Sequence, residues 1–262
     1  LPSSQPLLCE RFIPSLDSTD PVGLCSLPNR FLCEEMMTQL VDHLSYSAVR
    51  TYRRCPRQFY FQYVLGYRAI GSPLPLVKGS LFHELLSYYH AGKEVPYGEI
   101  IPQYLDADRG FDSTYEEEIL RVLGTFLGYS NCEQGRLSIS PGLTETEFTY
   151  KDILYDLNIK GVIDYLKDDD YVLAEHKLTG HPDIYTTLST RLQIGLYLLA
   201  SPQVQQAVIN CVTPPGLRRG KKGEPRRVFT ERIQKAFLAE PGRYITRNTY
   251  ARQEYNLTEI AE

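Results

Sequence analysis

Residues 160–180 read KGVIDYLKDDDYVLAEHKLTG and decide the fold. The apolar runs GVIDYL and YVLAEHK flank a polar turn, KDDD, a pattern that is typical of a β-hairpin. Glu175 and Lys177 are two residues apart and therefore project from one face of their strand. Pairing of the strands around the turn places Asp164 near the same level. A buried charge is costly unless it is paired or binds a metal, so these three residues predict a divalent-metal site with a basic helper.

The composition is that of a globular protein. The chain has 262 residues, enough for one large domain or two small ones, with 42% hydrophobic and 23% charged residues. The net charge of −4 gives no global signal for nucleic acid, so any polyanion site must be a local patch. No apolar run approaches the roughly 20 residues that are needed to span a bilayer, so we expect no membrane partner.

The six cysteines lack CxxC spacing, which weakens a zinc-ribbon interpretation. An even number would allow disulfides, but no hydrophobic secretory segment is visible. We therefore expect reduced thiols in a protein that is not secreted. The expected compartment is the cytoplasm, or the nucleus or an organelle in a eukaryote.

The chain is predicted to divide near residue 42. Residues 1–42 contain five prolines, and their six acidic residues outnumber two basic ones. We expect an acidic, loosely structured arm that either packs on the body or covers a basic groove. Residues 43–262 are predicted to form a single domain with a helical insert at about 94–140.

Residues 45–68, SYSAVRTYRRCPRQFYFQYVLGYR, predict two helices separated at Pro56. No carboxylate occurs between Leu44 and His83, whereas basic and aromatic residues alternate. This mixture suits single-stranded nucleic acid, in which bases stack on aromatic rings and phosphates pair with arginine. The alternative is an amphipathic helix pair that buries its aromatic rings and exposes its arginines to water. The predicted DNA contacts are Arg50, Arg53, Arg54, Arg57 and Tyr60.

A second basic segment, residues 214–230, reads PPGLRRGKKGEPRRVFT. Its glycines and prolines predict a loop. The loop either contacts phosphate through its basic residues or is a hairpin tip that aids solubility. The predicted DNA contacts in this segment are Arg218, Arg219, Lys221 and Lys222.

The remaining elements are predicted from periodicity. The alternation in residues 143–160 predicts two strands joined near Lys151, with Glu147 either a third acid or a solvent-facing residue. Residues 188–200 predict a helix in which Gln193 and Tyr197 share a face. A strand over 204–213 then implies a parallel crossover, whereas the chain after 231 predicts one helix, about 231–239, and an unpatterned end. Residues 79–91 predict a helix that carries His83, which alone is more often structural than a ligand.

Five motifs in this order resemble the RecB-like branch of the PD-(D/E)xK nuclease superfamily. The motifs are SAVRTYRRCPRQFYFQY, GSLFHELL, GVID, EHKLTG and QIGLY, between residues 47 and 197. The resemblance implies an α/β fold with a restriction-endonuclease-like core. Such a core has a mixed central β-sheet flanked by helices, here with added N-terminal helical elements and the helical insert.

The resemblance also implies roles for individual residues. A divalent metal, Mg²⁺ or Mn²⁺, would be held by three side chains and one backbone carbonyl, from His83, Asp164, Glu175 and His176. The catalytic group would comprise Lys177 as the catalytic lysine, with Gln193 and Tyr197 orienting the lysine and the scissile strand. The lysine could position water, donate a hydrogen bond to the phosphate, or act as a base if its pKa fell far below about 10.4.

The function implied is that of a metal-dependent DNA nuclease, in particular an exonuclease, in DNA repair, recombination or phage and mobile-element DNA processing. Its partners would be single-stranded DNA or duplex ends, and a helicase or recombination protein. Some members of this family hold an iron–sulfur cluster through four cysteines; Cys55 fits the first place, but no cysteine follows Cys211, so no iron–sulfur cluster is predicted. No GxxxxGK[ST] motif for ATP occurs. The alternative function is a non-catalytic DNA-binding or scaffolding module that retains the fold.

Overall fold

The computed structural model describes residues 43–67, 71–105, 113–133, 143–152, 157–167, 172–220 and 223–255. The arm predicted for residues 1–42 lies outside them, as do Lys221 and Lys222. The described residues all belong to one compact unit, Val41–Glu262. No helix among them is long and apolar enough to cross a membrane. The predicted division into an arm and a single nuclease domain stays a prediction.

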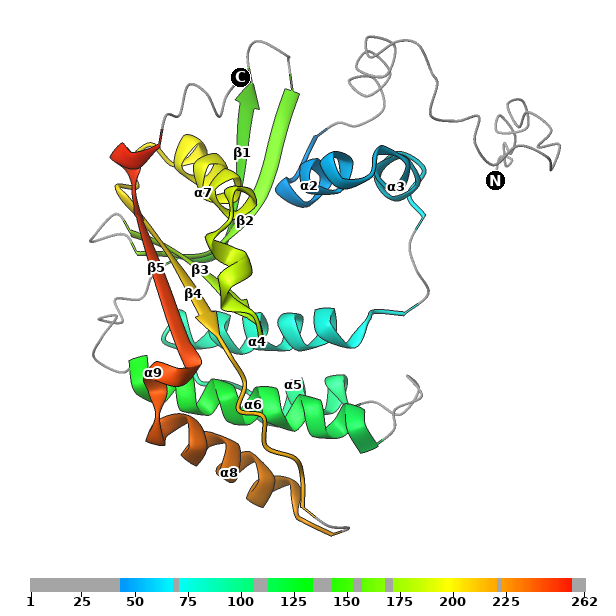
Figure 1. Ribbon diagram of the computed structural model, residues 1–262, viewed down its shortest axis with the longest axis vertical. Helices are drawn as coiled ribbons and strands as arrows, with labels where there is room; N and C mark the ends of the chain where they lie inside the picture. Colours follow the sequence, from blue (N-terminus) through cyan, green and yellow to red (C-terminus); the bar gives the residue numbers. More distant parts are fainter. Residues whose placement is uncertain are drawn as a thin grey trace, which may run out of the picture. The chain divides into compact units, whose positions relative to one another are not determined.

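The centre of the fold is a five-stranded mixed sheet in the order β1-β2-β3-β4-β5 (Figure 1). Three neighbouring pairs are antiparallel, and β3 and β4 are parallel. The parallel pair is connected through helix α7, which confirms the predicted crossover, and the sheet with its flanking helices confirms the predicted fold class. The strands are β1 (Leu143–Asp152), β2 (Leu157–Lys167), β3 (Val172–Leu178), β4 (Gln206–Val212) and β5 (Ile245–Ala251).

One strand boundary differs from the prediction. The sequence predicts that one strand ends at residue 160 and that another begins at Gly161. Instead β2 runs without interruption through this position. Gly161 lies opposite Phe148 of β1, and a Cβ atom at Gly161 would come within 2.6 Å of the Phe148 ring. The glycine therefore makes room for a cross-strand ring and does not break the strand.

The N-terminal helices start at the edge of β2. Leu44 forms a parallel bridge with Ile159, and the Ser45 hydroxyl then accepts a 3.2 Å hydrogen bond from the backbone N–H of Ala48. Pro56 starts the second helix, as predicted, and that helix continues into a turn of π-helix. These elements are α2 (Tyr46–Arg54), α3 (Pro56–Phe59) and η2 (Tyr60–Val64).

Helices α4, α6 and α8 pack in a layer, with α6 between the other two (Figure 1). Leu81 and Leu85 of α4 pack with Ile119 and Phe126 of α6 in one buried cluster. The region predicted as an insert thus contributes core side chains. The helices after η2 are α4 (Leu74–His90), α5 (Tyr97–Tyr104), α6 (Ser113–Glu133), η4 (Pro182–Thr186), α7 (Leu188–Ala200), α8 (Arg226–Ala239), α9 (Pro241–Tyr244) and η5 (Arg252–Glu254).

The two faces of β3 carry different chemistry because neighbouring residues of a strand point to opposite faces. Leu173 packs in a cluster with Ile194 and Leu198 of α7. Glu175, two residues further on, also faces α7. His176 faces the other way, toward α4 and α6. The candidate site therefore lies on one side of β3 and a buried polar cluster lies on the other.

Candidate active site

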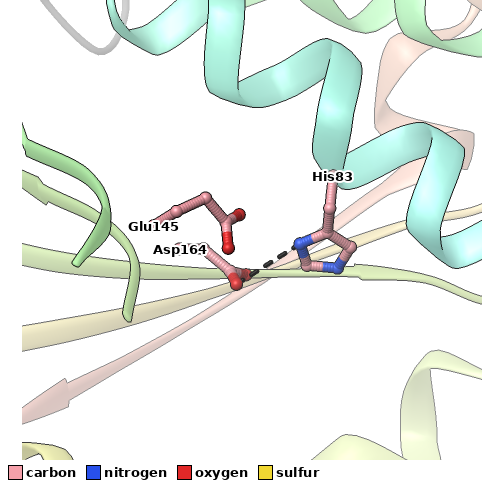
Figure 2. A group of neighbouring side chains, drawn as sticks. All are labelled: His83, Glu145 and Asp164. Carbon is pink, nitrogen blue, oxygen red and sulfur yellow. Dashed lines mark ion pairs between the residues drawn. The ribbon is translucent and has the colours of Figure 1, made fainter. Parts of the chain in front are cut away.

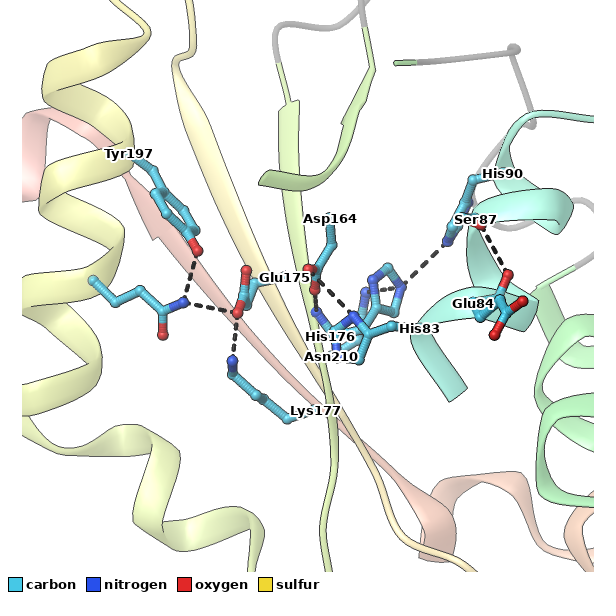
Figure 3. A network of polar contacts seen from close by, with 11 residues as sticks. His83, Glu84, Ser87, His90, Asp164, Glu175, His176, Lys177, Tyr197 and Asn210 are labelled. Carbon is cyan, nitrogen blue, oxygen red and sulfur yellow. Dashed lines mark hydrogen bonds and ion pairs between the residues drawn. The ribbon is translucent and has the colours of Figure 1, made fainter. Parts of the chain in front are cut away.

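The site lies where β2 and β3 part. Their ladder ends at Tyr165 and Ala174, and the next residues are Asp164 on β2 and Glu175 on β3. In place of a further ladder bond, Asp164 Oδ2 accepts a 2.7 Å hydrogen bond from the backbone N–H of His176 (Figure 3). The Asp164 carboxylate thus ends the pairing of β2 with β3. The hairpin predicted from the sequence brings Asp164 and Glu175 to the same level of the two strands.

His83 reaches the site from helix α4. Its Nδ1 lies 3.3 Å from Asp164 Oδ1 (Figure 2). Burial alone would lower the pKa of His83, but the hydrogen bond to Asp164 and the charges of Asp164 and Glu175 outweigh burial and raise it. Burial would raise the pKa of Asp164, but the interactions with His83 and the His176 N–H lower it. The pair is thus arranged to keep opposite charges together.

Glu175 is held at one oxygen only. Glu175 is 2% exposed, and its Oε1 accepts a hydrogen bond from Lys177 Nζ (Figure 3). The same oxygen accepts a 2.8 Å hydrogen bond from Gln193 Nε2. Its Oε2 is buried and has no hydrogen-bond partner among the described residues. Burial and the nearby Asp164 raise the pKa of Glu175, although Lys177 acts in the opposite direction. A buried carboxylate oxygen without a partner calls for a ligand.

Helix α7 supports Glu175. Gln193 and Tyr197 are one helical turn apart, and the same Gln193 Nε2 donates a 2.7 Å hydrogen bond to Tyr197 Oη. Burial lowers the pKa of Lys177, but the charge and hydrogen bond of Glu175 outweigh this and raise it. The structure therefore brings together the predicted catalytic residues Lys177, Gln193 and Tyr197 around one carboxylate.

The residues present fit a divalent cation. Ligand atoms of His83, Glu145 and Asp164 all lie within 4.8 Å of one another (Figure 2). Glu175 is not in this group, but its buried Oε2 is an oxygen that no described group satisfies. Carboxylate oxygens suit Mg²⁺, and an imidazole nitrogen beside them also suits Mn²⁺. The backbone carbonyl of His176 stays a predicted ligand.

Glu145 was missed by the sequence analysis, which weighed Glu147 as the third acid. Glu147 pairs with Val162, and Glu145 and Glu147 are both exposed. Glu145 lies opposite Asp164, at the one place inside the β1–β2 ladder where the pairing skips a residue. Its φ of 48° is strained for a residue with a side chain, and such strain is often found at functional sites. Burial and Asp164 raise its pKa.

We expect Glu145→Ala to weaken Mn²⁺ binding about 10-fold, because one of three clustered donors is lost, as with other changes around metal ligands. Glu147→Ala is the matched control, since it removes the same charge two residues away on the same strand. Calorimetric titration of the DNA-free protein with Mn²⁺ measures both variants. Equal Mn²⁺ affinities for the two variants would show that Glu145 does not bind the ion.

The predicted DNA-contact residues fall into two separate groups. Arg50, Arg53, Arg54, Arg57 and Tyr60 are all exposed on α2, α3 and η2. The second segment packs with α6 and α8, at the opposite end of the view in Figure 1. There Arg218 is exposed, but Arg219 lies 3.4 Å from Glu116 and donates to the carbonyl of Glu224. Arg219 is thus engaged within the protein, and Lys221 and Lys222 lie outside the described residues.

The chain belongs to the PD-(D/E)XK nuclease superfamily, since the model of that family matches residues 43–255. The superfamily inferred from the five motifs is thereby confirmed. Nucleases of this superfamily use divalent metals.

Seven chains of solved structures match this chain, and two of them serve as examples. One is a candidate exonuclease from Eubacterium rectale, at 9% identity over 91% of this chain and 87% of that chain, with a TM-score of 0.47. The other is a phage-related exonuclease from Haemophilus somnus 129PT, at 14% identity over 82% of this chain and 75% of that chain, with a TM-score of 0.37. No curated protein matches the chain in sequence.

Proposed function

We propose that the protein is a metal-dependent DNA nuclease that hydrolyses phosphodiester bonds. The observation that carries the proposal is the carboxylate of Glu175, buried and held by Lys177 and Gln193 at one oxygen and unpartnered among the described residues at the other. Asp164 and His83 stand beside it, joined by a 3.3 Å contact. This arrangement of carboxylates, imidazole and lysine suits a divalent ion and a phosphate where the pairing of β2 and β3 ends.

The ion would be held by His83, Asp164 and Glu175, with Glu145 as an additional carboxylate. When bound, a divalent ion supplies Lewis-acid chemistry, because it makes water more acidic and neutralises charge on the phosphate. The contact between Asp164 and the backbone of His176 fixes the direction of one carboxylate. The bonds from Lys177 and Gln193 do the same for Glu175.

Lys177 acts as a hydrogen-bond donor and a positive charge. In the metal-free site the charge and hydrogen bond of Glu175 raise the pKa of Lys177, which favours the ammonium form. As water adds to phosphorus and the bond to the leaving oxygen breaks, charge grows on the phosphoryl oxygens. A lysine held beside Glu175 stabilises that charge. Gln193 and Tyr197 keep Glu175, and through it Lys177, in place.

Exonuclease activity, and a role in repair, recombination or phage and mobile-element DNA processing, are the finer part of the proposal and rest on the resemblance of the five motifs to RecB-like nucleases. The competing function is a DNA-binding module that keeps the fold without cleavage. The arrangement around Glu175 supports the enzyme, because a binding module has no need for a buried carboxylate with an unpartnered oxygen.

A cleavage assay tests the proposal. End-labelled and internally labelled DNA, single-stranded and duplex, is incubated with Mg²⁺ or Mn²⁺, and with EDTA as control. We expect cleavage with either metal and none with EDTA. Loss of label from the ends before internal breaks appear would support an exonuclease. DNA binding without cleavage under every metal condition would favour the binding module.

The surface of α3 and η2 supports contact with unpaired bases. Tyr60, Phe61 and Tyr67 are 42%, 38% and 64% exposed, and the last two rings are stacked at 6.0 Å. The Arg57 guanidinium lies 5.7 Å from the centre of the Phe61 ring. Exposed rings beside exposed arginines suit bases and phosphates of single-stranded DNA. The buried Phe59 shows that the alternative, a helix pair that hides its rings, holds for only part of the segment.

The double variant Phe61→Ala/Tyr67→Ala should bind a single-stranded oligonucleotide about 10-fold to 100-fold more weakly, because two stacking surfaces are lost. An abasic oligonucleotide of the same length, which keeps only the phosphates, should bind both proteins equally. Leu76→Ala removes an equally exposed apolar side chain at 65% exposure and serves as the control. Fluorescence anisotropy with EDTA present measures each affinity. Equal losses on both oligonucleotides would contradict base stacking.

A further inference from the structure

His90 of α4 contacts both β2 and β3 on the face of the sheet opposite to Glu175. It lies seven residues after His83 on α4, so the two imidazoles share a face of the helix. Its ring stacks on Tyr165 with centroids 4.3 Å apart, and its Nε2 lies 3.4 Å from His176 Nε2 (Figure 3). Tyr165 follows Asp164 on β2, and His176 follows Glu175 on β3. One side chain thus touches the immediate neighbours of both acids.

Asn210 and Arg247 extend this cluster from β3 to β4 and β5. Arg247 Nε can only donate, and it donates to Asn210 Oδ1, so the amide nitrogen of Asn210 faces the other way. That nitrogen lies 3.5 Å from His176 Nε2. In the 3.4 Å contact between the two Nε2 atoms, one imidazole donates and the other accepts.

The cluster is anchored in the core. Arg247 Nη2 donates a 2.7 Å hydrogen bond to Glu133 of α6, and the Glu133 side chain is 2% exposed. His90 and His176 are both buried, and burial lowers the pKa of both imidazoles, that of His90 to about 4. His176 Nδ1 has no hydrogen-bond partner among the described residues. A buried ring nitrogen without a partner costs stability, so the arrangement is not explained by stability alone.

We propose that His90, His176 and Asn210 form a buried brace that sets the position of α4 against β2 and β3, and thereby aims His83 and Asp164 at one divalent ion. These three are positioning residues that touch neither DNA nor ion with their side chains. The inference rests on the proposed function, because the ion is that of the nuclease site.

The brace acts on the site through two short connections. Asp164 Oδ2 is held by the backbone N–H of His176, so a shift of His176 turns that carboxylate. The 3.3 Å contact between His83 and Asp164 depends on where α4 lies, and His90 fixes α4 against Tyr165. Partners that orient metal ligands are worth about 10-fold to 100-fold in metal affinity.

The experiment compares Mn²⁺ binding by the DNA-free wild type, His90→Leu and His90→Phe, with circular dichroism to confirm that each is folded. His90→Leu loses both the stack and the hydrogen bond, and we expect about 10-fold to 100-fold weaker binding. His90→Phe keeps the stack on Tyr165 and should lose less. Thr125→Val is the control, since it removes a buried polar group whose hydrogen bond stays within its own helix.

The imidazole tautomers give a second test that needs no variant to fold. Long-range proton–nitrogen NMR spectra of the wild type should show a proton on one of the two Nε2 atoms of His90 and His176 and none on the other. Two unprotonated Nε2 atoms would exclude this hydrogen bond and overturn the brace. A folded His90→Leu with the Mn²⁺ affinity of the wild type would also overturn the brace. If the wild type cleaves DNA in that case, the proposed function stays intact. A wild type that neither binds Mn²⁺ nor cleaves DNA would overturn both proposals.

Discussion

Lys177→Ala should lose nearly all DNA cleavage while remaining folded and able to bind DNA and Mn²⁺. Removing one group that stabilises transition-state charge costs about 10²- to 10³-fold in rate, and Lys177 is the only lysine among the described residues that pairs with Glu175. Single-turnover cleavage with saturating protein measures the rate without the influence of DNA affinity. Affinities for Mn²⁺ and DNA are measured on the same preparation.

The control for this prediction is Lys235→Ala, which removes an exposed lysine from α8 and should cleave at the wild-type rate. Lys177→Arg provides a second comparison, because it keeps the charge but changes the geometry of the donor. We expect it to retain only part of the activity. Full cleavage by Lys177→Ala would refute the assignment of the catalytic lysine.

Gly124→Ala should destabilise the protein by about 1–3 kcal/mol, although alanine is the better helix former. Gly124 lies where α6 touches α8. A Cβ there would come within 2.6 Å of Ile233 Cβ and 2.7 Å of the Thr230 carbonyl oxygen. The backbone of α8 would have to move away to avoid this contact. Gly128, one turn later, meets Phe237 Cβ at 2.7 Å in the same way.

The matched control is Gly79→Ala in α4, where a Cβ would meet nothing within 4 Å. This substitution should stabilise the protein by up to about 1 kcal/mol, since only helix propensity changes. Urea unfolding of the three proteins, followed by circular dichroism, gives the free energies of unfolding. A Gly124→Ala protein as stable as Gly79→Ala would show that the two helices are not in close contact.

The sequence predicted the parts of the fold that have strong local patterns. The hairpin of β2 and β3, the crossover through α7 and the break at Pro56 follow from periodicity and proline chemistry. β5 was missed because its residues alternate in burial only weakly, and its pairing with β4 connects distant segments. The starts of α4 and α8 were placed about five residues late, because both helices begin directly after a proline, at Pro73 and Pro225, without a capping side chain.

The site was predictable where side-chain chemistry and spacing coincide. Glu175 and Lys177 follow from their spacing on one strand. Glu145 could not be found in this way, because alternation places Glu145 and Glu147 on the same face. Only the pairing of β1 with Asp164 on β2, and the backbone distortion at that point, separate the two. The buried cluster behind His176 was also not predictable, since its members come from five elements.

The order of the strands has a consequence for how the protein folds. β1, β2 and β3 follow one another in both the chain and the sheet, so their contacts form between nearby residues. β4 needs the crossover, and β5 joins from near the end of the chain. Glu145, Asp164 and Glu175 all lie on the early strands, whereas His83 and Gln193 arrive with helices. The site is therefore complete only when these two helices have docked on the sheet.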